Sequence, residues 1–321
     1  MNHMNSCTCD HRRSHRPSIP THTFSIVARD AKTGEMGVAV QSHWFSVGSL
    51  VTWAEASVGA VATQAFAEIS YGPLGLDLMR AGRSAPEALA ALLATDEERE
   101  VRQVGMVDAL GRAAAHTGAR CLADAGHETG EGFTVQANMM ANPEVWPAMA
   151  RAYRETKGEL AERMLAALEA GQRAGGDIRG QQSASILVVR STSTGRPWAD
   201  TAIDLRVEDH PQPIQELRRL VGLHRAYRHM NRGDELLAAG KTEEALHDYR
   251  AAAGIAPEIE ELPFWHAVTL ADLGRLDEAL PIFRDVFAKN ADWATLLPRL
   301  PRAGLLRDDP DMMDRILAQV P

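Results

Sequence analysis

The residue best placed to do chemistry in this sequence is Thr23, which begins the first strand-like segment, residues 23–30 (TFSIVARD). A threonine at the start of a chain can attack an amide carbonyl through its hydroxyl, while its own α-amino group, with a pKa of about 7.7–8.0, serves as general base. This mechanism requires a free amino group, so residues 1–22 would have to be removed. Three alternatives stay open: self-cleavage between His22 and Thr23, exposure of Thr21 instead, or a domain without a free N-terminal nucleophile. A β-branched residue that merely starts a strand is the plainer explanation of Thr23.

Further polar residues stand at the ends of other strand-like segments. Residues 41–43 would supply substrate or oxyanion contacts, and Asn138 would supply an amide donor to an oxyanion; capping of turns and helices is the alternative role. Asp177 and Arg179 lie in a glycine-flanked loop that either presents a carboxylate and a guanidinium to a polar substrate or is fixed by their mutual ion pair. The complete set from which we expect substrate contacts is Gln41, Ser42, His43, Thr63, Gln64, Asn138, Asp177 and Arg179.

Some polar residues have structural explanations of similar weight. Thr63 and Gln64 follow a strand of small residues, so a pocket beside the backbone is expected there, although a buried Gln must be hydrogen-bonded in any case. Ser25 shares a strand face with Thr23, which makes it a neighbour rather than a nucleophile, and a small core-strand residue is the preferred interpretation. A single histidine on an apolar strand, His116, is interpreted as a satisfied core residue.

Motifs of other enzyme classes are absent from the sequence. It contains no G-x-S-x-G elbow, Walker loop, G-x-G-x-x-G turn or H-E-x-x-H helix, and its 12 histidines lack ligand spacing. We therefore expect no metal and no cofactor, and a metal-dependent hydrolase ranks low. Cys7 and Cys9 could hold a metal together with His11 and His15, but a flexible polar leader is the preferred interpretation.

Composition limits the partners and the compartment. The 321 residues carry a net charge of −9, which argues against a nucleic-acid or anionic-membrane partner. The sequence contains no run of 18 apolar residues, so no membrane span is predicted. The first 20 residues lack the apolar region of a secretory signal. The 3 cysteines fit a reducing compartment, so a cytoplasmic location is expected.

The order of predicted elements favours an α+β domain. Helices do not alternate one-for-one with strands, which argues against a doubly wound parallel sheet. We predict a disordered leader over residues 1–22, a first domain over 23–210 and a helical domain over 211–321. Strands are predicted at residues 23–30, 37–42, 49–54, 57–65, 101–107, 112–117, 133–138, 183–190 and 201–208, and helices at 74–79, 84–93, 143–156 and 159–173.

An internal repeat characterises the C-terminal part. Its period is 34 residues, which is that of tetratricopeptide repeats, and Pro257 closes the first unit. Such repeats bind peptides on a concave face, so a peptide or protein partner is expected there. The repeated positions are Gly240, Ala245 and Tyr249, followed by Gly274, Ala279 and Phe283.

Residues 23–190 resemble the domain-of-unknown-function 1028 family, which is placed in the N-terminal-nucleophile (Ntn) hydrolase superfamily. The matching stretches are TFSIVARD, TGEMGVAVQSHWFSVG, VGAVATQ, YGPLGLDLM, RQVGMVD, AAHTGARC, AGHETGEGFTVQANMM and GGDIRGQQSA. The resemblance implies a four-layer αββα sandwich and a homo-oligomer, with Thr23 as the nucleophile, but no defined substrate.

Two hypotheses follow for function. The first is an Ntn-type amidohydrolase that cleaves a C–N bond in a small amide or peptide-like substrate through Thr23. The second is a non-catalytic ligand-binding or scaffold protein whose helical repeats hold a protein partner. The long leader before Thr23 favours the second, and the polar residues at the strand ends favour the first.

Overall fold

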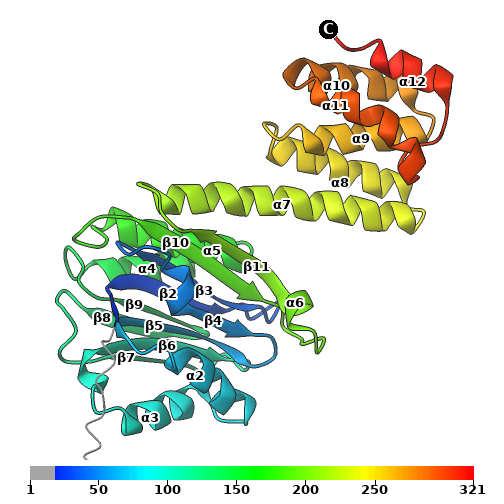
Figure 1. Ribbon diagram of the computed structural model, residues 1–321. Coiled ribbons are helices and arrows are strands. Elements are labelled where there is room, and N and C mark those ends of the chain that lie inside the picture. The colour runs from blue at the N-terminus through cyan, green and yellow to red at the C-terminus, as the bar shows by residue number, and fades with distance from the viewer. Residues whose placement is uncertain (1–18) are drawn as a thin grey trace, which may run out of the picture. The chain divides into compact units, whose positions relative to one another are not determined.

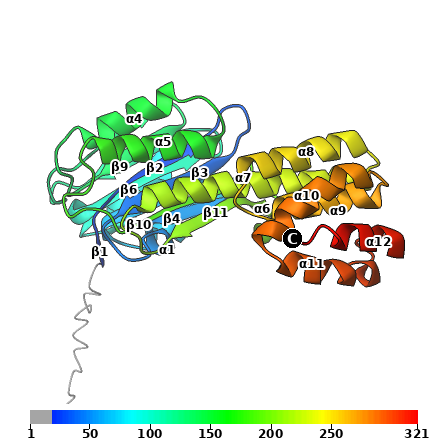
Figure 2. The ribbon, with the colours of Figure 1, turned by 90° about the horizontal axis from the view of Figure 1, so that it is seen from above.

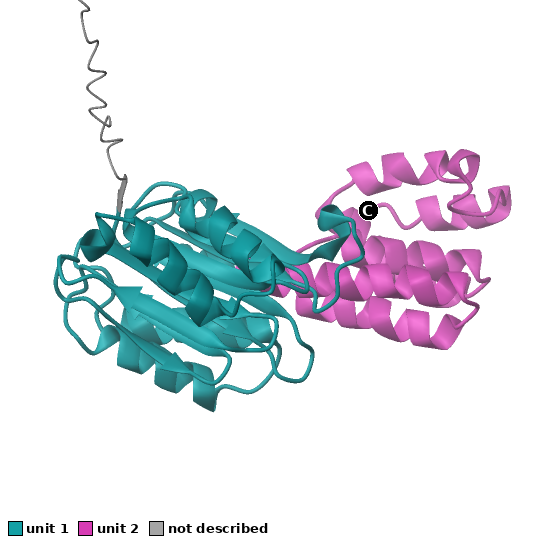
Figure 3. Cartoon of the chain, turned by 90° about the horizontal axis from the view of Figure 1, so that it is seen from below, with its two compact units in different colours: residues 1–217 teal, residues 218–321 magenta. Residues whose placement is uncertain are grey.

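The computed structural model describes residues 19–321. The chain forms two compact units that divide between Leu217 and Arg218, coloured separately in Figure 3. This division lies inside a long helix, α7 (Pro213–Ala238), whose first residues belong to the first unit.

Five strands form the first antiparallel sheet, with β5 (Gly59–Ala67) at its centre. β6 pairs along one edge of β5, whereas the other edge is shared: β4 pairs with residues 59–62 and β1 with residues 65–67. The remaining strands are β1 (Ile19–Thr21), β4 (Thr52–Glu55), β6 (Arg102–Asp108) and β7 (Ala113–Thr117).

The prediction that residues 1–22 form a disordered leader is wrong at the end of that segment. Residues Ile19–Thr21 form β1 on the sheet, and His22 is buried. The physical reason is that β4 leaves residues 65–67 of β5 uncovered, and an uncovered strand edge needs hydrogen-bond partners. The last residues of the leader supply them.

Six strands form the second antiparallel sheet, in the order β11-β10-β3-β2-β9-β8. The predicted hairpin of β2 and β3 is confirmed, with Thr23 opposite Ser42. The pattern did not predict β8, because its sequence GHETG lacks the apolar and β-branched residues typical of strands. The bounds are β2 (Thr23–Arg29), β3 (Met36–Ser42), β8 (Gly126–Gly130), β9 (Phe133–Ala137), β10 (Ser183–Val189) and β11 (Thr201–Val207).

The two sheets pack face to face, and helices cover both outer faces (Figure 1). The first sheet carries α2 (Tyr71–Arg80) and α3 (Ala85–Thr95). The second carries α4 (Val145–Glu155) and α5 (Leu160–Arg173), which lie side by side (Figure 2). The first unit is therefore an α+β domain, as predicted.

Local signals fix the starts of several elements. Ser84 caps α3 as predicted, because its hydroxyl accepts the backbone N–H of Glu87 while the Glu87 side chain accepts that of Ser84. The predicted strand at residues 49–54 is only partly correct, since a short helix precedes β4. The short elements are α1 (Gly48–Val51), α6 (Pro197–Asp200) and the 3-10 turn η1 (Arg99–Val101).

The core between the sheets changes from apolar to polar along the strands. Val27, Val38 and Ala60 are fully buried in the apolar part. Further along the same strands, towards the start of β2, the inward-facing residues are the equally buried Ser25 and Gln64. Polar groups survive such burial only with hydrogen-bond partners, so this end of the core must contain an ordered network.

The second unit consists of helices. The 34-residue repeat occupies equivalent places in it: Gly240 follows α7 with a φ of +74°, and Gly274 follows α9 with a φ of +80°. The other repeated positions, Ala245, Ala279, Tyr249 and Phe283, are all buried. The bounds are α8 (Thr242–Ile255), α9 (Glu261–Asp272), α10 (Leu276–Lys289), α11 (Asp292–Leu296) and α12 (Pro310–Leu317), with turns η2 (Leu297–Arg299) and η3 (Pro301–Ala303).

Within residues 19–321, no helix combines the length and the apolar character needed to cross a lipid bilayer.

Candidate functional site

The peptide bond between His22 and Thr23 lies at the start of β2, where the polar end of the core begins. The carbonyl oxygen of His22 accepts two hydrogen bonds, one from Ser42 Oγ at 2.6 Å and one from Arg179 Nη2 at 2.8 Å. Two convergent donors on one carbonyl oxygen are the arrangement that stabilises an oxyanion. Ser42 reaches this position because it lies directly opposite Thr23 in the hairpin.

Thr23 is completely buried in this state of the chain. Its hydroxyl donates to the carbonyl oxygen of Thr21 at 2.8 Å. Its own carbonyl oxygen accepts from the backbone N–H of Asn138 at 3.1 Å and from Gln64 Nε2 at 3.2 Å. The backbone on both sides of the His22–Thr23 bond is thus held in place.

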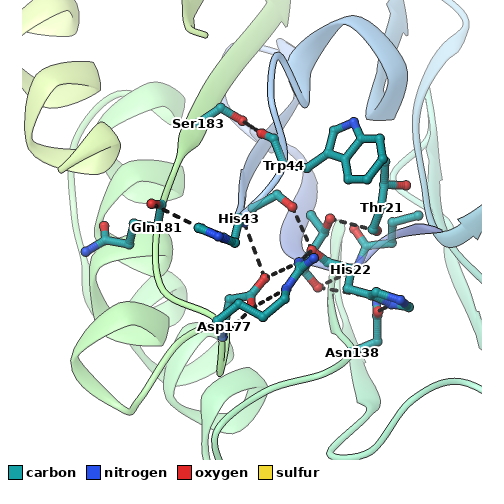
Figure 4. A network of polar contacts seen from close by, with 12 residues as sticks. Thr21, His22, His43, Trp44, Asn138, Asp177, Gln181 and Ser183 are labelled. Atoms are coloured by element: carbon teal, nitrogen blue, oxygen red, sulfur yellow. Dashed lines mark hydrogen bonds and ion pairs between the residues drawn. The ribbon is translucent and has the colours of Figure 1, made fainter. Parts of the chain in front are cut away.

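Asp177 positions the guanidinium of Arg179. The carboxylate accepts Nε of Arg179 at 3.0 Å and Nη2 at 2.7 Å, and its side chain has no solvent exposure. Asp177 Oδ2 also accepts the backbone N–H of His43 at 3.3 Å. A buried carboxylate with a bidentate arginine holds the cation in one orientation (Figure 4). The ion pair therefore both fixes the loop and aims a charged donor at the His22 carbonyl.

The imidazole of His22 lies in a polar and aromatic pocket. Its Nδ1 is 2.8 Å from Asn138 Oδ1, and its ring meets Phe66 edge-on with centroids 5.5 Å apart. Asn138 Nδ2 donates to Gln103 Oε1 at 2.8 Å, so the Asn138 oxygen faces His22 and the imidazole donates to it. Burial, opposed by the Asn138 hydrogen bond, lowers the pKa of His22, which favours the neutral ring.

A layer of buried amides connects the two sheets beneath this site. Gln64 Nε2 donates to Gln103 Oε1 at 2.7 Å, and Ser25 Oγ donates to Gln64 Oε1 at 2.6 Å. Gln136 Nε2 in turn donates to Ser25 Oγ at 2.6 Å. Gln103 and Gln136 are not among the site residues predicted from the sequence. The sequence feature that could have identified them is an amide side chain within a strand-like segment that is rich in apolar residues, in RQVGMVD and FTVQA.

Two left-handed backbone conformations flank the site. Ala65 has a φ of +69° directly after Gln64, and Met139 has a φ of +58° directly after Asn138. Non-glycine residues adopt this region at a cost of about 1–3 kcal/mol, which surrounding contacts must offset. Such strain gathers at functional sites, so its position next to two site residues supports the assignment of the site.

Most of the predicted site residues come together here, but two do not. Gln41 lies opposite Phe24 in the hairpin, on the face of β3 turned away from Ser42 and the other sheet. Both polar atoms of the Gln41 side chain are buried and lack a hydrogen-bond partner among the described residues. Thr63 points away from Gln64, and its hydroxyl donates to the backbone carbonyl of Glu68 at 3.0 Å.

Ser25 belongs to this network, whereas His116 does not. Ser25 is a small, fully buried residue of β2, as the preferred interpretation holds, and it lies in the amide layer on the same strand as Thr23. The ring of His116 is 2.9 Å from the backbone oxygen of Arg99, away from this network. No group of three or more potential metal ligands occurs within residues 19–321. The cysteine and histidine cluster that begins at Cys7 lies outside the described residues.

Comparison with known proteins places the first unit in a family. The crystal structure of a protein from Silicibacter pomeroyi, described as a DUF1028 protein, is similar to this chain with a TM-score of 0.57 and 32% sequence identity. The match covers 63% of this chain and 85% of that one. No curated protein matches. The profile of the family of unknown function DUF1028 matches residues 23–217, so the chain belongs to the DUF1028 family.

Proposed function

We propose that the first unit is an Ntn-type amidohydrolase that frees Thr23 by cleaving its own His22–Thr23 bond and then hydrolyses an amide bond in a small or peptide-like substrate. The observation that carries this proposal is the His22 carbonyl oxygen, which accepts both Ser42 Oγ and Arg179 Nη2. Two donors that converge on one carbonyl oxygen stabilise the negative charge that collects there when the carbonyl carbon is attacked.

The chemistry of self-cleavage follows from the position of Thr23. Its hydroxyl oxygen attacks the carbonyl carbon of His22, and negative charge collects on the oxygen that Ser42 and Arg179 already bind. The C–N bond then breaks, the hydroxyl proton passes to the leaving amine, and an ester joins His22 to Thr23. Water hydrolyses that ester, which releases the leader as a carboxylate and leaves Thr23 with a free α-amino group.

The same groups would serve the substrate reaction. The freed amine is the general base for the Thr23 hydroxyl. A substrate carbonyl placed where the His22 carbonyl lay would receive the same two donors, and Asp177 keeps Arg179 aimed at it. The layered α+β architecture supports the Ntn interpretation by analogy of fold alone.

A second candidate function is a binding protein that keeps its leader, with the helical unit as a tetratricopeptide-like peptide-binding module. The 34-residue repeat with its buried positions supports that interpretation of the helices. So does a cavity of about 450 Å³, lined among others by Asp234, Tyr249, Trp265 and Asp272. Cytoplasmic location, homo-oligomer formation and the lack of a nucleic-acid partner stay predictions from the sequence.

N-terminal sequencing and intact-mass measurement of the untagged full chain test the first proposal against the second. We expect the wild-type chain and Thr23→Ser to begin at residue 23, and Thr23→Ala to retain its leader, because alanine lacks the attacking oxygen. Hydrolysis of simple amides by the processed chain is then screened. A wild-type chain that keeps residues 1–22 after prolonged incubation rules out the free-amine mechanism and favours the binding protein.

A further inference from the structure

The residues before the cleavage site lie where the acyl part of a substrate must lie. In self-cleavage His22 is the acyl residue, and the ester that it forms with Thr23 has the same connectivity as the acyl-enzyme of an external substrate. The carbonyl donors, Ser42 and Arg179, are also the same. Whatever holds the end of the leader is therefore a preformed acyl-side subsite.

The first part of this subsite is a strand edge. Residues Ile19–Thr21 pair antiparallel with residues 65–67 of β5, and β4 covers only residues 59–62 of the same edge. Release of the leader exposes unpaired backbone groups at residues 65–67. An extended peptide can add to such an edge as a new strand, with its main chain supplying affinity.

The second part is the pocket of the His22 side chain. Gln103 orients the Asn138 amide so that its oxygen accepts from the ring, and Phe66 contacts the ring edge-on at 5.5 Å. Burial, together with the nearby Arg179 cation, lowers the pKa of His22 despite the Asn138 hydrogen bond and the Asp177 carboxylate, so a positively charged occupant is disfavoured. The pocket therefore suits a neutral ring that can donate a hydrogen bond.

We propose that residues Ile19–His22 occupy the acyl-side site as a built-in substrate analogue, and that the external substrate is a peptide-like amide. Its acyl part adds as a strand to β5, and the residue before the scissile bond carries a neutral, hydrogen-bond-donating ring. This inference rests on the proposed function, which places the scissile carbonyl at His22. The cleaved leader is accordingly a competitive inhibitor of the mature site.

Binding of the peptide that self-cleavage would release tests the proposed subsite without requiring the enzyme to hydrolyse any substrate. The probe is acetyl-Ile-Pro-Thr-His with a free carboxylate, titrated by calorimetry into the processed chain, or into a chain expressed as Met followed by Thr23 if no processing occurs. Circular dichroism and the melting temperature, compared with the full chain, check that this form is folded. We expect binding that weakens about five- to tenfold when leucine replaces the terminal histidine, because one buried hydrogen bond is lost.

A variant pair adds a control. Phe66→Ala should weaken the probe about three- to tenfold through loss of the edge-on ring contact. Leu110→Ala, which truncates an exposed apolar side chain in the turn between β6 and β7, should leave binding unchanged. Equal affinity for the histidine and leucine probes, or no binding by the folded chain, overturns the inference.

If the chain that begins at Thr23 does not fold, backbone amide hydrogen exchange in the full chain tests the inference instead. In a Thr23→Ala background the leader stays attached, and the additional change His22→Leu should speed exchange at residues 65–67 about five- to tenfold. Unchanged exchange there shows that His22 does not anchor the strand and overturns the inference. Probe binding without any amide hydrolysis would instead contradict the proposed function, and the strand edge and the His22 pocket would then remain a peptide-binding site without an acyl-side role.

Discussion

Deletion of a single hydroxyl, in Ser42→Ala, separates a role in catalysis from a role in folding. Ser42 is fully buried, and its Oγ donates to the His22 carbonyl oxygen at 2.6 Å. In the folded ground state the variant loses one neutral hydrogen bond, worth about 1 kcal/mol, and Arg179 still satisfies the carbonyl. The free energy of unfolding should therefore fall by only about that amount.

The cleavage rate should fall much further. Removal of one donor to a developing oxyanion typically slows a reaction about 10²–10³-fold, or about 2.7–4 kcal/mol. Because Arg179 remains as the charged donor, we expect the lower end of this range for Ser42→Ala. Arg179→Lys should cost at least as much, since a lysine cannot both pair with Asp177 in bidentate fashion and reach the His22 oxygen.

The assay follows the intact mass of freshly purified full chain over time, alongside urea unfolding of the same sample. Ser185→Ala is the matched control, because Ser185 is a buried serine on the neighbouring strand whose hydroxyl lacks a partner among the described residues. It should cleave at the wild-type rate. Comparable slowing by Ser42→Ala and Ser185→Ala, or slowing that merely tracks lost stability, would refute the oxyanion argument.

Three further predictions concern other parts of the chain. Burial lowers the pKa of His266 to about 4, so its contribution to the stability of the helical unit is complete above about pH 6.5 and is lost as pH falls towards 4; thermal melts should show a smaller acid sensitivity for His266→Gln. Gly240→Ala places a side chain at φ +74° with nothing within 4 Å of the new Cβ, so it should cost about 1–2 kcal/mol of unfolding free energy through backbone strain alone. Asp108→Asn weakens the ion pair with Arg112 and the acceptance of the Ala85 N–H at the start of α3, so it should cost about 1–3 kcal/mol in urea unfolding and leave the cleavage rate unchanged.

The sequence was informative wherever a local rule applies. Alternation and turn residues located the β2–β3 hairpin, and the Ser84 cap located the start of α3. The 34-residue spacing predicted that positions such as Gly240 and Gly274 are equivalent. These features depend on residues close in the chain or on a fixed period, so a single sequence is enough to predict them.

The site needed the tertiary structure, because its members come from distant parts of the chain. Ser42 and Arg179 converge on the His22 carbonyl only through the folding of two strands and a loop. Residue type alone could not distinguish Gln41, which faces away from the other sheet, from Gln64, which faces towards it. The alternation of residues along a strand shows which side chains share a face, but it does not show which of the two faces packs against the other sheet.

Residues 19–22, at the end of the leader, show most clearly what the sequence alone could not predict. In isolation, residues 19–22 form too short and too polar a segment to predict a strand, and nothing local marks Thr21 and His22 as buried. The gap that β4 leaves on the edge of β5 decides their structure, and the pocket of Asn138 and Phe66 decides the place of His22. The sequence by itself determined most of the elements and the family, whereas only long-range packing decided that Thr21 and His22 lie buried at the site that they precede.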